Sequence, residues 1–424
     1  MTKLKRVATT IAGGTPAVHE PSFWSDNDEE GLPWVSIGDM SGHHLVTNTS
    51  RRVTSKGISA TRLPVGEPGT LLLSMYASLG HTAFLTTQAS WNQAILGIDV
   101  SSTHAIGFVR YALEAIRPSL AELARSNTQA NLNAEQVGNL VLPDPPLDEQ
   151  RRIADFLDAE TTRIDVLTSA RERQLALLTE RFLARVFNTV RGSNESDVRK
   201  NSGLDWLGTI PSTWPVMPVT YQFEVILGKM LNQERSHGTH LAPYLRNTNV
   251  QWDRIDTEDL LQMDFPPEES KRYALQQGDL LVCEGGEPGR AAVWQGHMQK
   301  VYYQKALHRV RARAYSSPRW LFYCLRAATA QNVFAVEGNT TTIAHLTGEQ
   351  FRAHRFPFPD RKTQDRLTAK LDADNQSQRQ LEKKLHQQIA LLAERRQALI
   401  TAAVTGQFDV ATASGRNVTE GVSS

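Results

Sequence analysis

The chain has only two cysteines, Cys283 and Cys324, among its 424 residues. Two cysteines are too few for a disulfide-stabilised scaffold, so a reducing compartment is the default expectation. The first residues, MTKLKRVATTIAGGTP, lack the apolar core of roughly 7 to 15 residues that marks a secretory signal. No apolar run approaches the ~18 residues needed to cross a bilayer. We therefore expect a soluble, cytoplasmic protein that makes no membrane contact.

The sequence also lacks an excess of charge of either sign, because 46 basic residues (Lys and Arg) stand against 45 acidic ones. This balance excludes a histone-like cationic protein and an acidic disordered chain. It does not exclude nucleic-acid binding, since a basic face can lie on a neutral protein. At about 100–200 residues per domain, the length predicts two to four domains, each with its own core.

The motifs of common catalytic and metal sites are missing. Gly228-Lys229 is followed by Met230 and lacks the earlier glycine of a P-loop, so no ATP motor is predicted. His237 and His240 lie three apart without a third ligand nearby, and exposed turn histidines are the simpler interpretation. The two cysteines have no Cys-x-x-Cys partners and are expected in the core. We therefore predict no catalytic residue, no cofactor and no metal site.

Two further segments have both a functional and a structural interpretation. Asp144-Pro145-Pro146-Leu147 is similar to the Asp/Asn-Pro-Pro-aromatic loop of adenine amino-methyltransferases, but leucine replaces the aromatic residue and no glycine-rich cofactor turn lies upstream. A Pro-Pro turn that leads into a helix is the better interpretation. The glycine-rich run Glu284–Arg290 could form a phosphate-binding nest, although its carboxylates favour a structural turn.

The sequence contains an internal repeat. Gln150–Glu160 (QRRIADFLDAE) aligns with Gln364–Asp374 (QDRLTAKLDAD), an offset of 364 − 150 = 214. The same offset carries Ala176–Arg181 onto Ala390–Arg395, so the register persists over roughly forty residues. Weaker matches precede each copy, at offsets that drift between 209 and 212. This pattern predicts two tandem units, each a divergent globular part followed by a better-preserved helix.

The better-preserved segments are predicted to be long helices. Residues 150–191 contain no Gly or Pro, and apolar residues recur at spacings of three, four and seven there and from Gln364 to about Val404. At 1.5 Å per residue each helix would be roughly 60 Å long, and neither could bury its apolar stripe alone. The economical solution is an antiparallel pair with one globular domain at each end. Two separate, solvent-exposed helices are the alternative.

The globular parts are predicted to be mixed α/β. Short β-rich runs lie between Gly- and Pro-bearing turns at Thr70–Leu73, Ile95–Val100, Leu280–Cys283 and Ala306–Arg311. A helix is predicted over Ala105–Arg125, kinked or split by Pro118, with a counterpart at Pro318–Val333. The predicted fold class is therefore α+β: two mixed α/β domains separated by two long helices packed as an antiparallel coiled coil, with a pseudo-twofold internal repeat.

Three features together resemble one family. They are the duplicated architecture, the proline-rich lead into the first helix (Leu142–Ile153, LPDPPLDEQRRI) and the segment Ser202–Trp214 (SGLDWLGTIPSTW). With them come the runs Ile11–Pro16, Pro33–Met40 and Pro243–Val250. Over about residues 3–410 the chain resembles the DNA-specificity subunit of type I restriction–modification enzymes. The second copy of the lead, Phe356–Gln364, is degenerate and lacks the Pro-Pro pair.

The resemblance implies a non-catalytic, sequence-specific DNA-binding subunit. Its two target-recognition domains would each read one half of a bipartite asymmetric site on double-stranded DNA, and the paired helices would set the spacer. Two methyltransferase (modification) subunits would dock on it, and two ATP-dependent translocase–nuclease (restriction) subunits would complete the complex. A coiled-coil adaptor without DNA specificity and an enzyme with a disguised site are the alternatives.

The repeat also predicts the boundaries. These are 1–146 for target-recognition domain 1, 147–192 for spacer helix 1, 193–215 for a linker, 205–359 for target-recognition domain 2, 360–410 for spacer helix 2 and 411–424 for a flexible tail. Neither domain is basic, since residues 1–146 carry 10 basic and 12 acidic residues and residues 205–359 carry 16 and 15. Because bulk affinity for DNA comes from phosphate neutralisation, we expect weak binding by the chain alone.

The candidate DNA-binding residues are polar or basic loop positions that follow a strand and match across the two units. In domain 1 they are Thr15, Ser36, Arg51, Arg52, Ser78, Asn92 and Asn127. In domain 2 they are Lys229, Arg246, Asn249, Arg290, Lys305 and Asn339. Asn can pair with adenine and Arg with guanine through two hydrogen bonds, but a structural turn or a surface role is equally open for each position.

Overall fold

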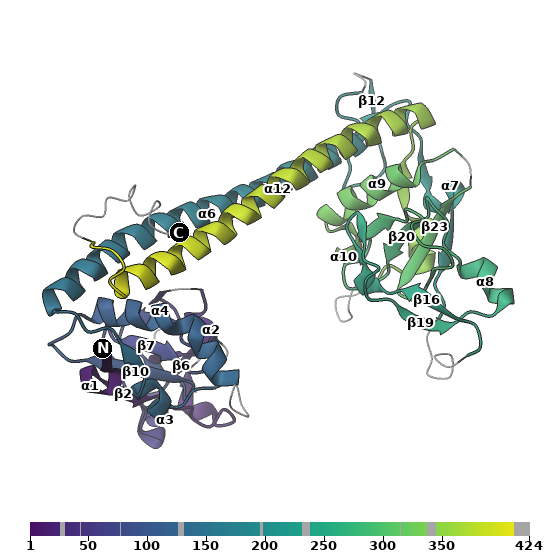
Figure 1. The fold of residues 1–424 in the computed structure, drawn as a ribbon. Coiled ribbons are helices and arrows are strands. Elements are labelled where there is room, and N and C mark those ends of the chain that lie inside the picture. Colours follow the sequence, from purple (N-terminus) through teal and green to yellow (C-terminus); the bar gives the residue numbers. More distant parts are fainter. Residues whose placement is uncertain are drawn as a thin grey trace. The chain divides into compact units, whose positions relative to one another are not determined.

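The computed structural model describes residues 1–25, 30–42, 44–76, 78–125, 131–195, 198–230, 238–313, 315–336 and 345–410. The chain divides into two compact units, of which unit 1 comprises Met1–Glu172 with His386–Ser424 and unit 2 comprises Arg173–Leu385. Two 44-residue helices, α6 (Leu147–Val190) and α12 (Arg361–Val404), each contribute a segment to both units (Figure 1). Each unit therefore contains one globular part and a segment of each long helix.

Unit 1 is built on a five-stranded sheet with the order β2-β10-β7-β8-β5. Its strands are β2 (Ala8–Ala12), β10 (Ile95–Val100), β7 (Leu71–Ser74), β8 (Thr82–Leu85) and β5 (Leu45–Val46). Alternate side chains of β7 enter different cores: Leu71 and Leu73 pack with α4 (Ile106–Arg125), whereas Leu72 belongs to a second core on the opposite face, with Val35, Met40 and Trp91. A second sheet has the order β3-β6-β4-β9, with β3 (Trp24–Ser25), β6 (Arg51–Val53), β4 (Leu32–Val35) and β9 (Ser90–Trp91).

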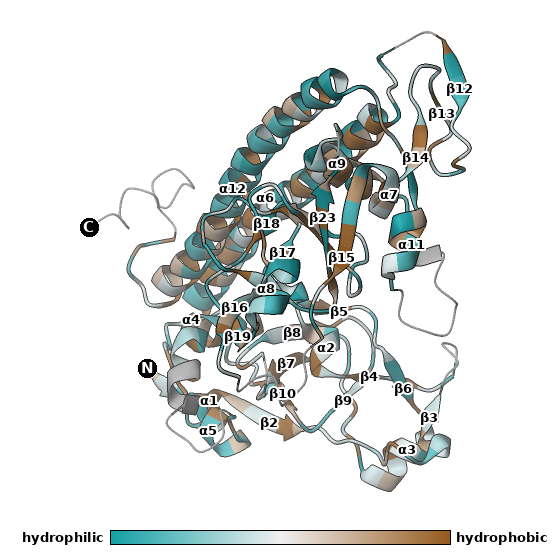
Figure 2. Ribbon diagram, turned by 90° about the vertical axis from the view of Figure 1, so that its right-hand side faces the viewer, coloured by the Kyte–Doolittle hydropathy of each residue, from teal (hydrophilic) through white to brown (hydrophobic). Residues whose placement is uncertain are grey.

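Unit 2 repeats this topology. Its main sheet has the order β15-β23-β20-β21, with β15 (Phe223–Leu227), β23 (Leu307–Ala312), β20 (Leu280–Cys283) and β21 (Ala291–Val293), and α9 (Pro318–Ala330) packs on it. A second sheet has the order β19-β16-β22, with β19 (Leu261–Asp264), β16 (Leu241–Leu245) and β22 (Tyr302–Tyr303). The parallel pair β16–β22 corresponds to the parallel pair β4–β9 of unit 1. In Figure 2 the largely apolar β15 is mostly brown, whereas β6, with its two arginines, is teal.

Shorter elements complete the two globular parts. They are β1 (Thr2–Lys3), α1 (Leu4–Val7), η1 (Pro21–Phe23), α2 (Ile37–Met40), α3 (Ser55–Thr61), α5 (Ala134–Gly138), β11 (Val141–Leu142), β12 (Arg199–Asn201), β13 (Thr209–Pro211), β14 (Val216–Pro218), α7 (Val219–Gln222), η3 (Asn247–Asn249), β17 (Val250–Gln251), β18 (Arg254–Ile255), α8 (Pro267–Tyr273), α10 (Val333–Val336), α11 (Gly348–Ala353) and β24 (Arg355–Pro357).

The segment predicted as a linker, residues 193–215, is folded where the structure describes it. Strand β12 pairs with β13, and Leu207, Ile210 and Trp214 are buried in the core of unit 2. The polar residues of the segment are therefore explained by its tight turns.

A buried glutamine explains why the repeat is best preserved at the start of each long helix. The Gln150 side chain accepts a hydrogen bond from the Ala105 amide (2.9 Å) and donates one to the Pro145 carbonyl (2.9 Å). The Gln364 side chain does the same with the Ser317 amide (2.8 Å) and the Pro359 carbonyl (2.7 Å). Both glutamines are at most 2% exposed. Each therefore ties the proline-rich lead and its long helix to the beginning of α4 or α9.

Within each unit the segments of α6 and α12 run in opposite directions. In unit 1 Phe156 packs against Phe408, and further along α6 Asp165 pairs with Arg396 (Oδ1–Nε 3.4 Å). In unit 2 the guanidinium of Arg185 pairs with Asp374 (2.8 Å). Apolar side chains of both helices join the core of each unit. In the part of the chain that the structure describes, no helix has the length and apolarity to cross a membrane.

Candidate nucleic-acid interface

Several predicted DNA-binding side chains of domain 1 also support the fold of their own loops. The Ser36 hydroxyl donates to Asp39 Oδ2 (2.7 Å), which also accepts from the Ser36 amide (2.8 Å), so Ser36 caps α2. The Asn92 side chain accepts a hydrogen bond from the Ala94 amide (2.9 Å) and shapes the turn before β10. The Thr15 hydroxyl contacts the side chain of Gln93.

The two arginines of β6 are placed differently. The Arg51 side chain is exposed, and its guanidinium lies 4.0 Å from the ring centroid of Trp24. Arg52 donates from Nη2 to the Gly31 carbonyl (2.8 Å) and from Nε to the Glu30 carbonyl (3.3 Å). Ser78 is half-buried beside the turn that leads into β8. Asn127 lies outside the described residues.

Domain 2 engages most of its predicted residues in internal contacts. Lys229 is 2% exposed, donates to the Asp264 carbonyl (2.6 Å) and pairs with Glu269. Asn249 is 4% exposed and accepts from the backbone amide of Arg246 (2.9 Å). Both side chains are therefore covered by domain 2 itself.

The remaining predicted residues of domain 2 are more accessible. Arg246 pairs with Asp259 (2.7 Å), which is itself exposed. Arg290 donates to the carbonyl and the side-chain oxygen of Asn247 (both 3.2 Å). The Lys305 side chain is exposed, and Asn339 lies outside the described residues.

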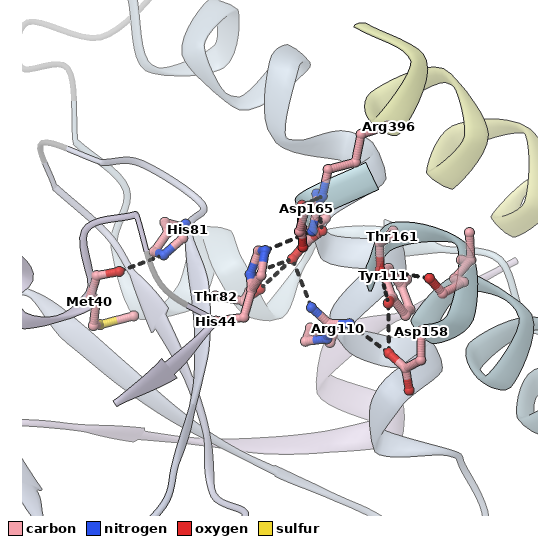
Figure 3. Close-up of polar contacts among 12 residues, drawn as sticks. Met40, His44, His81, Thr82, Arg110, Tyr111, Asp158, Thr161, Asp165 and Arg396 are labelled. Atoms are coloured by element: carbon pink, nitrogen blue, oxygen red, sulfur yellow. Dashed lines mark hydrogen bonds and ion pairs between the residues drawn. The ribbon is translucent and has the colours of Figure 1, made fainter. Parts of the chain in front are cut away.

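A polar cluster that the sequence did not indicate joins domain 1 to α6 in unit 1 (Figure 3). The Tyr111 hydroxyl donates to Asp158 Oδ1 (2.6 Å) and lies 3.0 Å from the Thr161 hydroxyl. Arg110 donates to the same Asp158 oxygen (3.1 Å). Burial raises the pKa of Tyr111 to about 12, so its hydroxyl stays protonated and remains a donor.

The same cluster reaches α12 through Arg396. Its guanidinium donates to Glu114 (3.2 Å), pairs with Asp165 (3.4 Å) and lies 2.7 Å from Nε2 of His44. Burial lowers the pKa of His44, the nearby Arg396 and Arg110 lower it further, and Glu114 opposes them. The neutral imidazole is the form that accepts a hydrogen bond from Arg396.

The lowered pKa of His44 predicts that acid destabilises unit 1. The unfolded chain takes up the proton more readily than the folded chain, so the contribution is present above the ordinary pKa of 6.5 and is lost as the pH falls below it. His44 is about one third exposed, so we expect a loss below about 1 kcal/mol. Thermal unfolding at pH 7.5 and 5.5 should show a smaller acid-induced decrease for His44→Gln than for the parent chain. Equal decreases in both proteins would contradict this prediction.

A second cluster joins domain 2 to α12 in unit 2. Asp253 lies in the turn between β17 and β18 with a φ of 58°, and its carboxylate is 15% exposed. It accepts hydrogen bonds from Arg319 of α9 and from Asn375 (2.8 Å) and Arg379 (3.0 Å) of α12. The hydrogen bonds that Arg319 donates to Asp253 and Asp372 raise its pKa above the ordinary value, despite its burial. A turn of domain 2 is thus held directly on the long helix.

The two clusters share one element of the repeat. The Tyr323 hydroxyl donates to Asp372 Oδ1 (2.5 Å), as Tyr111 does to Asp158. The offsets are 323 − 111 = 212 and 372 − 158 = 214, which match those of the sequence repeat. The surrounding ion pairs differ, so each domain is fixed to its helix segment by a common tyrosine–aspartate contact and by charges of its own.

The described residues were compared with the requirements of metal and thiol sites. They contain no group of three His, Cys, Asp or Glu side chains that could hold a metal ion. Both cysteines are buried, as predicted, and burial raises the pKa of Cys283 to about 11 and that of Cys324 well above its ordinary value. The run Glu284–Arg290 is a turn between β20 and β21, in which the Gly289 amide donates to the Cys283 carbonyl (3.0 Å).

Comparisons with known proteins point to one family. Residues 2–176 match the family model of the type I restriction modification DNA specificity domain. The chain is 22% identical over 159 residues to the MjaIX type I restriction enzyme specificity subunit of Methanocaldococcus jannaschii, which covers 37% of this chain and 36% of that protein. It is 24% identical over 292 residues to the EcoBI specificity subunit of Escherichia coli, with 63% and 57% covered. The chain thus spans less than two thirds of the length of these relatives.

The fold is also found in a solved structure. A chain from work on the complex assembly and conformational transition of the type I R-M system superimposes with a TM-score of 0.67 at 15% sequence identity. The match covers 96% of this chain and 97% of the other. At this low identity the similarity shows a shared fold alone. The shared fold extends over nearly the whole chain.

Proposed function

We propose that this chain, a member of the family of type I restriction–modification specificity subunits, is the non-catalytic subunit that directs such a complex to its DNA sequence. The observation that carries the proposal is the duplicated α/β unit, in which both copies keep the same order of four main-sheet strands and the same buried attachment to a long helix. Two copies of one reading module suit a bipartite DNA site. Domain 1 (1–146) reads one half-site and domain 2 (205–359) the other.

The long helices (147–192 and 360–410) act in this proposal as an antiparallel coiled coil that sets the spacer. Their opposite course inside each unit supports this role. Two methyltransferase subunits dock on the chain in the cytoplasm and modify adenine, and two ATP-dependent restriction subunits complete the nuclease. The chain itself supplies no catalytic group and needs no cofactor.

DNA contacts in this proposal come from side chains that the domains leave accessible. Arg51 and Lys305 are exposed, and Arg52, Arg246 and Arg290 are partly buried. Five cations on two near-neutral domains give little phosphate neutralisation, so tight binding requires the methyltransferase subunits around the duplex.

Co-expression with a methyltransferase partner tests this function. Mapping of modified adenines across the host genome should reveal one bipartite asymmetric motif, and cells with the methyltransferase alone should lack it. A chain that acts only as a coiled-coil adaptor would give no motif and would retain a cognate duplex no better than a scrambled one. That result would reject the proposal.

A further inference from the structure

Domain 1 contains a groove of about 800 Å³ that lies between the second sheet and two neighbouring loops. Its base includes the buried side chains of Val46 and Ala89, which are 3% and 1% exposed. Its rim carries the exposed side chains of Asn48 and Gln88, and among the described residues of the lining only Arg52 is charged. The groove therefore combines an apolar base with neutral hydrogen-bonding groups.

The topology of the main sheet brings the two loops together. Strands β5 and β8 are parallel, so the chain leaves both of them at the same edge of the sheet. The Thr86 hydroxyl donates to the Val46 carbonyl (2.7 Å), and Ala89 forms a bridge with Gly66. The first contact joins the beginnings of the loop with Asn48 and the loop with Gln88, and the second ties the Gln88 loop to Gly66.

The polar side chains on the rim retain hydrogen-bond donors and acceptors that could bind a ligand. The side-chain amide of Asn48 has no hydrogen-bond partner within the described ranges. Gln88 donates from Nε2 to Glu67 Oε1 (2.7 Å), which leaves its carbonyl oxygen as an acceptor. Arg52 is oriented through Nε and Nη2 by two backbone carbonyls, and Nη1 has no partner among the described residues.

We infer that this groove is the base-reading surface of domain 1, with Asn48 and Gln88 as specificity-determining residues and Arg52 beside them. The inference rests on the proposed function and names the site within domain 1. Amide side chains can pair with the major-groove edge of adenine, and arginine with that of guanine. A lining whose described residues carry a single charge fits the reading of bases better than the neutralisation of phosphates.

The test uses the chain in complex with its methyltransferase and records the methylated motif. Asn48→Ala and Gln88→Ala should each relax the choice of base at one or two positions of one half-site, with roughly a ten- to hundredfold loss of discrimination. The other half-site and the spacer should stay unchanged. Ser102→Ala, which removes an exposed hydroxyl of domain 1 outside the groove, should leave the whole motif unchanged.

A variant of nearly unchanged size keeps the test decisive if an alanine variant fails to fold. Asn48→Asp turns an amide into a group that only accepts hydrogen bonds, so the preferred base at its position should shift from adenine toward cytosine. If the folded variants keep the parent motif with the parent discrimination, the groove does not read bases and the inference is wrong. If the parent complex itself methylates no defined motif, the proposed function fails instead.

Discussion

Asp253→Ala is expected to lower the melting temperature of unit 2 by roughly 6–12 °C. The substitution leaves Arg319, Asn375 and Arg379 without the carboxylate that accepts their hydrogen bonds. Removal of one partner from a buried ionic cluster costs about 3–5 kcal/mol, and the half-exposed Arg379 places this case at about 3 kcal/mol. For a unit of this size each kcal/mol corresponds to about 2–4 °C. Differential scanning calorimetry measures the effect.

Two matched variants separate the causes of that loss. Asp253→Asn keeps an oxygen acceptor and tolerates the positive φ, so its loss should be about half as large. Asp259→Ala removes an aspartate–arginine pair whose carboxylate is 82% exposed, and it should cost about 0–1 kcal/mol. If Asp253→Ala is as mild as Asp259→Ala, the cluster does not hold the turn on α12.

The elements set by local pattern were predictable from the sequence. A long stretch without Gly or Pro and with regular apolar spacing predicted a helix over 150–191, and α6 spans Leu147–Val190. The strands at Ile95–Val100 and Leu280–Cys283 occur with those bounds. Pro118 is accommodated inside α4. These elements follow from short-range propensity and from apolar faces that must be buried.

The functional surfaces depend on contacts that no local pattern records. The groove requires the parallel pairing of β5 with β8, and its amides Asn48 and Gln88 belong to no motif. The cluster of His44, Glu114 and Arg396 joins residues from three distant parts of the chain. The sequence did hold one unused signal: Ser36 followed by Asp39 is a capping-box pattern, which favours a helix cap over a base contact.

Lengthening both long helices should lengthen the unread spacer of the DNA site. Four residues inserted between Ala170 and Gln174, with four more near Leu385, add about one turn to each helix, or ~6 Å. At about 3.4 Å per base pair, the spacer should grow by one to two base pairs while both half-site sequences are kept. Both helices must be changed because their antiparallel packing otherwise loses its register. The methylated motif in cells that carry the variant is the measurement.

The control variants distinguish an effect on the spacer length from an effect on the bases that are recognised. Under the proposed function, exchange of residues 1–146 for the corresponding domain of a type I specificity subunit should alter one half-site and leave the spacer unchanged. Insertion into α6 alone should abolish methylation or unfold the chain, since apolar side chains of α6 and α12 share the cores of both units. If the doubly lengthened chain keeps the original spacer, or changes the bases read instead of their separation, the helices do not set the distance. The antiparallel-pair model would then be wrong, because it predicts that the DNA spacer lengthens when the helices between the two domains are lengthened.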